Sequence, residues 1–238
     1  MALTYSQYVT SLANLIVVPE ADANFQVDLP NIIDDAELRI YRDLDLLNTV
    51  VRDASSTLTT GTRTFSLPSA SGTFVVTEQI NVITPSSATT ADGGTRNSLV
   101  PASKEVLDML WPSSTGSTVP QYFAPVTQET FIVGPWPDAA YPVEVVGTIR
   151  PLTLSSTNVT TLLSAYFPDL FVAASMVRAS GFLQNYGQAV DDPKQAVTWE
   201  VHYQSLLANA NVEEARKKFT SYGWSSKEPS PLATPPGT

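Results

Sequence analysis

The spacing of apolar residues changes twice along this chain, and that change limits the fold more than any other feature. Near the N-terminus, Tyr5, Tyr8 and Leu12 recur at the spacing of a helix face, and Trp199 and Tyr203 do the same near the C-terminus. Between these regions, apolar residues alternate or form short β-branched runs, which is typical of strands. The sequence therefore predicts an α+β fold, with N-terminal helices, a central antiparallel β domain, a C-terminal antiparallel helix pair that completes a helical bundle, and an extended tail.

Two helices are predicted before the β region. Thr4 is a good N-cap for the first, and Pro19 ends it. Asp28, two residues before Pro30, favours the start of the second. The apolar stripe of this second helix continues through Ile33, Ala36, Ile40, Leu44 and Leu47. Its early acids favour the positive end of the helix dipole and are expected on an acidic outer face: Asp34, Asp35 and Glu37.

The composition changes at residue 54. Ser and Thr occupy 20 of the 50 positions in residues 54–103, and only Arg63, Glu78, Asp92 and Arg96 are charged there. The β-branched runs of this stretch predict short antiparallel strands at 63–67, 73–76 and 79–84. The polar, glycine-containing residues 86–97 predict a long exposed loop or hairpin tip.

A short helix and a second β block follow. Ser103 caps a predicted helix over residues 103–110. Residues 130–133 and 143–149 are candidate partner strands, separated by a stiff turn at 134–138 that contains two prolines.

The last third of the chain predicts two packed helices. One begins at Pro168, and the other follows Asp191 or Asp192 ahead of Pro193. The second has the stripe Trp199, Tyr203, Leu206 and Ala210, which should pack on the first helix. We therefore predict a helical bundle domain from residues 1–52 with 159–219, a β-rich domain from 53–158, and an extended tail from 220–238.

The end of the last helix and the tail hold the candidate partner-facing residues. Arg216, Lys217 and Lys218 lie near the predicted helix end, where cations compensate the dipole. The tail is rich in proline and contains Trp224 close to Tyr222. An aromatic side chain in a segment with no core of its own suits docking to a partner, although the same pattern also fits a disordered tail with an isolated tryptophan.

The charge and the chemistry of the side chains exclude several functions. The net charge of −10 argues against nonspecific binding to nucleic acid or to anionic membranes. The chain contains no cysteine and a single histidine, His202, so it offers no thiolate chemistry and no multi-histidine metal site. We predict no catalytic, cofactor-binding or metal-binding residue and no enzymatic activity. No secretory signal and no apolar run of the roughly 18 residues of a membrane span is recognised, so no membrane association is expected.

Two other functions stay open at this point. The carboxylate pairs Asp34–Asp35, Asp191–Asp192 and Glu213–Glu214 are best explained as caps or solvated faces, yet a glycosidase could combine distant acids. Trp111 and Trp136 could stack on a sugar in a carbohydrate-binding module, or could cover the edges of the β block.

Three segments in a fixed order resemble one family. The first is the early helix, with Ala36-Glu37-Leu38-Arg39-Ile40-Tyr41-Arg42-Asp43-Leu44. The second runs from Pro120-Gln121-Tyr122-Phe123-Ala124 through Phe131-Ile132-Val133-Gly134-Pro135-Trp136-Pro137-Asp138 to Arg150-Pro151. The third begins at Tyr166-Phe167-Pro168-Asp169-Leu170 and ends in a helix with Tyr203 and Leu206-Leu207. In this order they resemble the head-to-tail adaptor, or connector, proteins of tailed bacteriophages.

The resemblance implies a structural virion protein of the neck or tail, assembled in the host cytoplasm. It implies a ring of about twelve copies between the portal protein and a tail or nozzle protein. It also implies that DNA passes through the ring during ejection without specific binding. A tail-tube, neck or tail-completion protein is the alternative within the same virion.

The acidity of the chain fits such a passage, because a negatively charged lining repels phosphate. This hypothesis places several of a set of acids at the lumen: Asp34, Asp35, Asp43, Asp45, Asp191 and Asp192.

Overall fold

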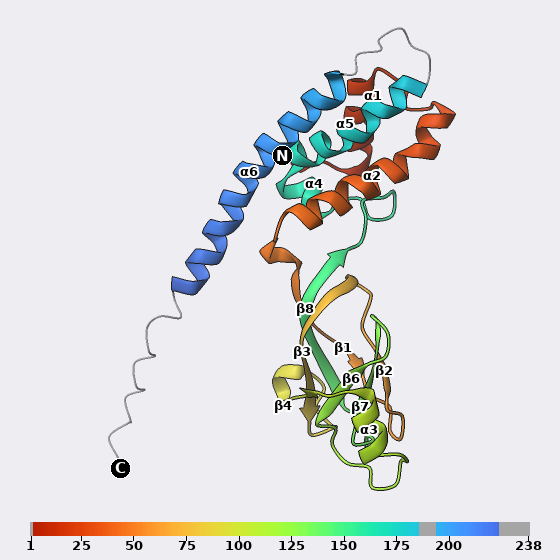
Figure 1. The fold of residues 1–238 in the computed structure, drawn as a ribbon, viewed down its shortest axis with the longest axis vertical. Coiled ribbons are helices and arrows are strands. Elements are labelled where there is room, and N and C mark those ends of the chain that lie inside the picture. The colour runs from red at the N-terminus through yellow and green to blue at the C-terminus, as the bar shows by residue number, and fades with distance from the viewer. Residues whose placement is uncertain (1, 186–193, 224–238) are drawn as a thin grey trace. The chain divides into compact units, whose positions relative to one another are not determined.

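The computed structural model describes residues 2–185 and 194–223 of the 238-residue chain. The chain divides into two compact units, which are described separately (Figure 1). Residues 1–47 and 153–238 contribute to the helical unit, and residues 48–152 form the β unit. The β unit is thus inserted between two halves of the helical unit. The α+β class predicted from the sequence is confirmed.

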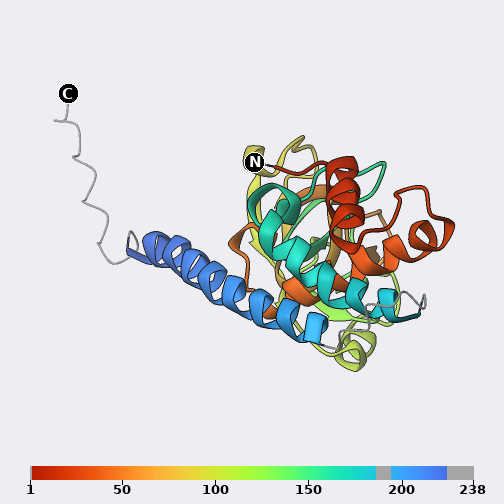
Figure 2. The ribbon, with the colours of Figure 1, turned by 90° about the horizontal axis from the view of Figure 1, so that it is seen from above.

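The helical unit contains both ends of the described chain. Its N-terminal half contributes two helices, α1 (Tyr5–Ile16) and α2 (Ala23–Asp43). Its C-terminal half contributes α4 (Leu162–Tyr166), α5 (Pro168–Asn185) and α6 (Lys194–Gly223). Figures 1 and 2 show the first turns of α6 beside α5, and its later turns extending past the other helices of the unit. Helix α4 was not predicted, and α6 continues beyond its predicted end at residue 219.

The first helix begins as predicted and the second does not. The Thr4 side chain accepts a hydrogen bond from the Gln7 N–H, and the Gln7 side chain accepts one from the Thr4 N–H, which completes a capping box. Helix α2 starts at Ala23, because Asp22 Oδ1 accepts from the N–H groups of Asn24 and Phe25 at 3.0 and 2.9 Å. The predicted start at Asp28 was therefore wrong, and Pro30 lies inside the helix.

The internal proline is tolerated because the extra turns bury large side chains. A proline within a helix costs about 3 kcal/mol. Burial of Phe25 and Leu29, both almost fully inaccessible, contributes about 1.5–3 kcal/mol each and offsets this cost.

The core of the helical unit joins all five of its described helices through aromatic and aliphatic side chains, with α4 contributing Leu163. The Tyr8 ring stacks on Phe171 of α5, with ring centroids 4.5 Å apart. Tyr203 and Ala210 of α6 are buried and Trp199 and Leu206 are partly buried, so the predicted stripe of this helix is confirmed. Residues 191–193, where the helix start was predicted, lie outside the described residues.

The β unit contains two four-stranded sheets. The first has the strand order β1-β8-β3-β4, from β1 (Val50–Thr57), β8 (Pro142–Pro151), β3 (Gly72–Thr84) and β4 (Thr95–Ser98). The second has the order β2-β7-β6-β5, from β2 (Thr64–Ser66), β7 (Thr130–Gly134), β6 (Tyr122–Pro125) and β5 (Val100–Pro101). The described pairs are antiparallel except β5 with β6, which is parallel.

Several strand predictions need correction. Strand β1 was not predicted, and the expected loop 86–97 ends in β4. The runs 73–76 and 79–84 form one long strand, β3, whose register against β8 shifts twice at bulges. The expected partners at 130–133 and 143–149 belong to different sheets. Pro135 and Pro137 between them have no N–H for a hairpin ladder, and the chain changes sheet there.

The remaining prediction in this unit, the helix capped by Ser103, is confirmed. Helix α3 (Lys104–Leu110) begins where the Ser103 hydroxyl accepts from the Val106 N–H. The larger core of the β unit lies between the sheets and includes Phe74, Val82, Phe131, Val143 and Val145.

Candidate interaction surfaces

The basic end of α6 is bound within its own unit. Lys217 Nζ lies 2.9 Å from Glu213 Oε1 and 2.6 Å from Glu214 Oε1, and it stands 5.3 Å from the centre of the Phe167 ring. The hydrogen bond to Glu214 is the main reason that the pKa of Lys217 is raised. Lys218 pairs with Asp45, which follows α2. The two ion pairs of Lys217 lie within α6 itself, whereas the Lys218–Asp45 pair and the contact of Lys217 with the Phe167 ring connect α6 to the segment after α2 and to the residue before α5.

The helix end was predicted at residue 219, next to the three cations that were expected to compensate the helix dipole, and this position was wrong. Helix α6 continues to Gly223, so Arg216, Lys217 and Lys218 lie before its last turn. Arg216 is exposed. Tyr222 lies on α6 although its side chain is not among those described, and Trp224 lies outside the described residues. Whether these five residues face a partner stays a prediction.

Glu214 forms a second connection at the same place. Its side chain is buried, and Oε2 accepts a hydrogen bond from the Leu47 N–H at 3.1 Å. Sequence reasoning treated Glu213 and Glu214 as one solvated pair, whereas only Glu213 is exposed. The sequence did contain a signal for this burial: at helical spacing, Glu214 falls on the same face as Tyr203 and Ala210, which were predicted to be buried.

A buried carboxylate also lies at the place where the chain returns to the helical unit. Glu37 of α2 was expected on the outer face, yet it is almost fully buried, and its Oε1 accepts from the Leu154 N–H at 3.1 Å. Burial is the main cause that raises the pKa of Glu37 to about 7, and the hydrogen bond from Leu154 opposes this shift. The expectation failed because Glu37 follows Ala36 and precedes Ile40 on the wide buried side of α2.

The first sheet of the β unit carries a cluster of charged side chains around Glu144. Arg96 Nε donates to both carboxylate oxygens of Glu144, at 3.0 and 3.2 Å, and Arg52 Nε donates to Oε2. Asn81 Nδ2 donates to Oε1 at 3.0 Å, and Asp92 accepts from both arginines. Burial tends to raise the pKa of Glu144, but the hydrogen bonds from Arg96, Asn81 and Arg52 lower it overall. The cluster neutralises itself, so it is a structural feature of the sheet.

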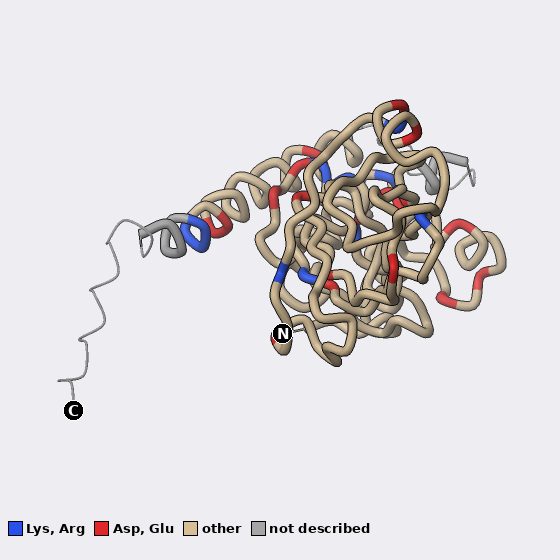
Figure 3. The backbone as a smooth tube through the Cα atoms, turned by 90° about the horizontal axis from the view of Figure 1, so that it is seen from below, with Lys and Arg blue, Asp and Glu red and all other residues tan. Residues whose placement is uncertain are grey.

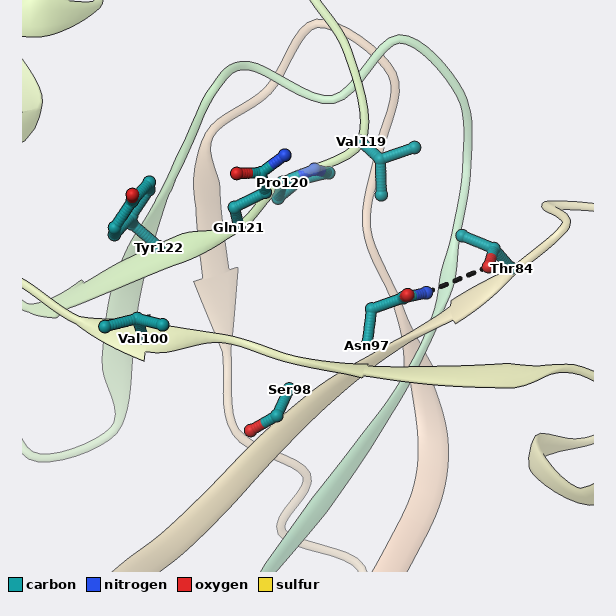
Figure 4. A pocket seen from close by; sticks show the side chains of 8 residues that line it. All are labelled: Thr84, Asn97, Ser98, Val100, Val119, Pro120, Gln121 and Tyr122. Atoms are coloured by element: carbon teal, nitrogen blue, oxygen red, sulfur yellow. Dashed lines mark hydrogen bonds between the residues drawn. The ribbon is translucent and has the colours of Figure 1, made fainter.

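A hollow of about 490 Å³ lies beside β4 and β5, where the chain passes from one sheet to the other (Figure 4). The Asn97 amide donates to Thr84 Oγ1 at 2.8 Å along one wall, and Gln121 and Tyr122 stand across from it. The other lining residues are Ser98, Val100, Val119 and Pro120. The lining contains no charged side chain, so the hollow suits an uncharged segment or ligand.

The two tryptophans considered for sugar binding are engaged in packing. Trp136 Nε1 donates to the Trp111 carbonyl oxygen at 3.1 Å, and the Trp111 ring lies 5.7 Å from that of Tyr122. The guanidinium of Arg63 stands 5.5 Å from the Trp136 ring centre. Both rings therefore cover the β unit, as their neighbouring prolines suggested.

Two further absences concern the described part of the chain. Across residues 2–185 and 194–223, no group of three or more His, Asp or Glu side chains is placed to hold a metal ion. His202 is exposed on α6, 5.9 Å from the Trp199 ring. None of the described helices combines the length and apolarity needed to cross a bilayer.

Comparison with known proteins identifies the family. The sequence model of the SU10 adaptor protein family matches residues 3–226, which include both units. The chain belongs to the SU10 adaptor protein family. No match was found among curated proteins.

Membership gives the adaptor a structural role in a bacteriophage virion, where it contacts other head or tail proteins. The matched range also contains the three segments on which the resemblance was based. The resemblance to head-to-tail adaptors is thus confirmed at the level of the family.

Proposed function

We propose that this adaptor forms a ring between the portal protein and a tail or nozzle protein, and that DNA crosses the ring during ejection without specific binding. The family match over nearly the whole chain carries the proposal. The net charge of −10 supports the passage of DNA, because few cations are present to hold phosphate through counterion release.

The acids proposed at the lumen differ in how far their charge is compensated. Asp35 pairs with Arg178, Asp43 with Arg39 and Asp45 with Lys218. Asp34 is exposed, while Asp191 and Asp192 lie outside the described residues. Among the described acids, the exposed Asp34 is therefore the strongest candidate for the repulsive lining, and a map of the ring with all six acids on the outside would remove this part of the proposal.

The copy number in purified particles tests the ring. Quantitative mass spectrometry against the capsid protein should give about twelve copies per particle for a closed connector ring. Many tens or hundreds of copies would instead favour a tail-tube protein, the second candidate. Absence from the particle would contradict both.

Portal binding is assigned to the end of α6 and to the segment that follows it. Removal of residues 220–238 should weaken binding to the portal protein of the same phage, with little effect on thermal unfolding, since the core of the helical unit that the structure describes is built from residues 8–210. The matched control exchanges Tyr222 and Trp224 for alanine and keeps the length of the segment. Unchanged portal binding in the deletion variant would contradict this assignment.

A further inference from the structure

The outer face of α6 is unusual for the solvent side of a helix. Three valines lie along it with large exposed fractions: Val197 at 63%, Val201 at 65% and Val212 at 51%. The exposed positions between them are Thr198, His202, Gln204, Ser205, Ala208, Asn209 and Asn211. Figure 3 shows α6 with few charged residues until the acidic and basic ones near its C-terminal end. An exposed helix face normally carries charged side chains, so this surface, termed the α6 stripe, is suited to contact.

A second apolar surface lies where α1 passes into α2. Val17 and Val27 are the most exposed large apolar side chains of the described part of the helical unit, at 88% and 77%, and Leu15 is also exposed. Three acids surround this surface, termed the α1–α2 corner: Glu20, Asp22 and Asp28. Within the helical unit, the three views in Figures 1, 2 and 3 place the corner on the side away from α6.

A ring of identical copies in which each copy contacts the next needs two different surfaces on opposite sides of the subunit, and the α6 stripe and the α1–α2 corner meet this requirement. A ring of identical subunits uses one surface of each copy against a different surface of the next, and rotation then closes the ring. The charges favour this pairing. Two corners facing one another would bring Glu20, Asp22 and Asp28 of both copies together, whereas the corner can meet the uncharged α6 stripe without like-charge repulsion.

We propose that adjacent copies of this chain contact one another through the α6 stripe of one copy and the α1–α2 corner of the next. This inference rests on the proposed ring and names the surfaces that close it. Ser205 and Ala208 lie between the valines and allow the backbone of a neighbour to approach closely. Helix α6 can present the stripe because its opposite side is fastened to the rest of the unit: Tyr203 donates to Asp43, Glu214 accepts from the Leu47 N–H, and Lys217 lies over the Phe167 ring.

The absence of cysteine makes a direct test available. In the full-length chain, Val27→Cys and Val201→Cys are combined, assembled with the portal protein, and treated with bis-maleimides of short and long spacer. Since the two positions lie on opposite sides of one helical unit, cross-linking joins separate copies. We expect a ladder of dimers, trimers and larger products, with no ladder from either single variant. The control pair Val159→Cys with Val201→Cys keeps the first thiol exposed on the helical unit, beside the start of α1 and at the other end of that helix from the corner, and should give no ladder.

A charge variant provides a second readout. Val201→Asp sets a carboxylate against the acidic corner and should reduce the assembled fraction in light scattering about tenfold or more. Val201→Thr retains the shape and should assemble normally. Equal melting temperatures establish that both variants are folded, which the exposure of Val201 leads us to expect.

The outcomes separate this inference from the ring itself. Rings of the expected mass without a ladder from the 27/201 pair would overturn the assigned surfaces and leave the proposed function standing. Dimers from Val201→Cys alone, as abundant as the products of the pair, would show that two α6 stripes meet and would also overturn it. A particle without about twelve copies would contradict the proposed function.

Discussion

Glu37 of the helical unit and Glu144 of the β unit are both buried, and the two units accommodate these carboxylates in opposite ways. Glu37 of the helical unit accepts a hydrogen bond from a backbone N–H, and no ion pair of the described residues includes it. Glu144 of the β unit is held by two arginines and an asparagine. The pKa of Glu37 is therefore raised to about 7, mainly by burial, while the pKa of Glu144 is lowered.

The difference reflects how each unit is built. The helical unit joins distant parts of the chain through an apolar core, and Glu37 ties the returning chain at Leu154 to α2. The first sheet of the β unit has its charged cluster on β1, β3, β4 and β8, so it combines an apolar core with a polar network. Stability should then depend on packing in the first unit and on both packing and charge in the second.

The largest expected effect comes from the cores. Phe171→Ala removes the ring that stacks on Tyr8 and should destabilise the helical unit by about 3–5 kcal/mol, because a buried aromatic leaves a cavity. Phe131→Ala is the matched change in the β unit. Hydrogen exchange read by mass spectrometry should show lost protection mainly within the altered unit. Equal loss in both units for either variant would contradict their independence.

A smaller effect is expected at the charged cluster. Glu144→Gln removes the buried carboxylate that the partly exposed Arg52 and Arg96 share and should cost about 2–3 kcal/mol, since charge-assisted hydrogen bonds to a buried acceptor are lost. Asp92→Asn at the exposed rim of the same cluster should change the unfolding midpoint in urea very little. Because the folded pKa of Glu144 is lowered, its contribution is present near neutral pH and is lost as the pH falls through that pKa. A variant as stable as the wild type at pH 7 would show that the cluster adds nothing.

The smallest effect, with the opposite pH dependence, is expected at Glu37. Its folded pKa is raised from 4.5 to about 7, so its contribution is complete below about pH 4.5 and is lost as the pH rises through about 7. Glu37→Gln keeps an acceptor for the Leu154 N–H without the buried charge. It should therefore stabilise the protein by about 2 kcal/mol at pH 8 and change it little at pH 5. Urea titrations at both pH values measure the difference, and a constant difference would refute the assignment.

The sequence predicted local features, in both units, better than long-range ones. Thr4, Ser103 and the stripe through Tyr203 indicated correct elements, because caps and helical periodicity act over a few residues. The start of α2 was missed because the prediction relied on Asp28 and Pro30, whereas the cap is Asp22. In the β unit the strand types were recognised, but not which strands share a sheet, since pairing depends on contacts between distant residues.

The same limit applies to the candidate surfaces. The family resemblance was found from three ordered segments, and the match over residues 3–226 confirmed it. The partners of Lys217 and Lys218 were not predicted, because Asp45 and Glu214 converge with them only through the fold. Arg52 and Glu144 are separated by 92 positions in the sequence. The few charged residues in the Ser- and Thr-rich stretch, among them Asp92 and Arg96, were the only trace of that cluster in the sequence.

The insertion of the β unit between residues 47 and 153 also sets the order in which the ribosome delivers the parts of the subunit. At about 5–20 residues per second, α1 and α2 leave the exit tunnel several seconds or more before α5 and α6 arrive to cover Tyr8, Phe25 and Leu29. The β unit is continuous in sequence and is complete before α6 is translated. A chain that terminates before residue 194 therefore lacks α6, and the proposed contact between copies predicts that such incomplete products do not enter the ring.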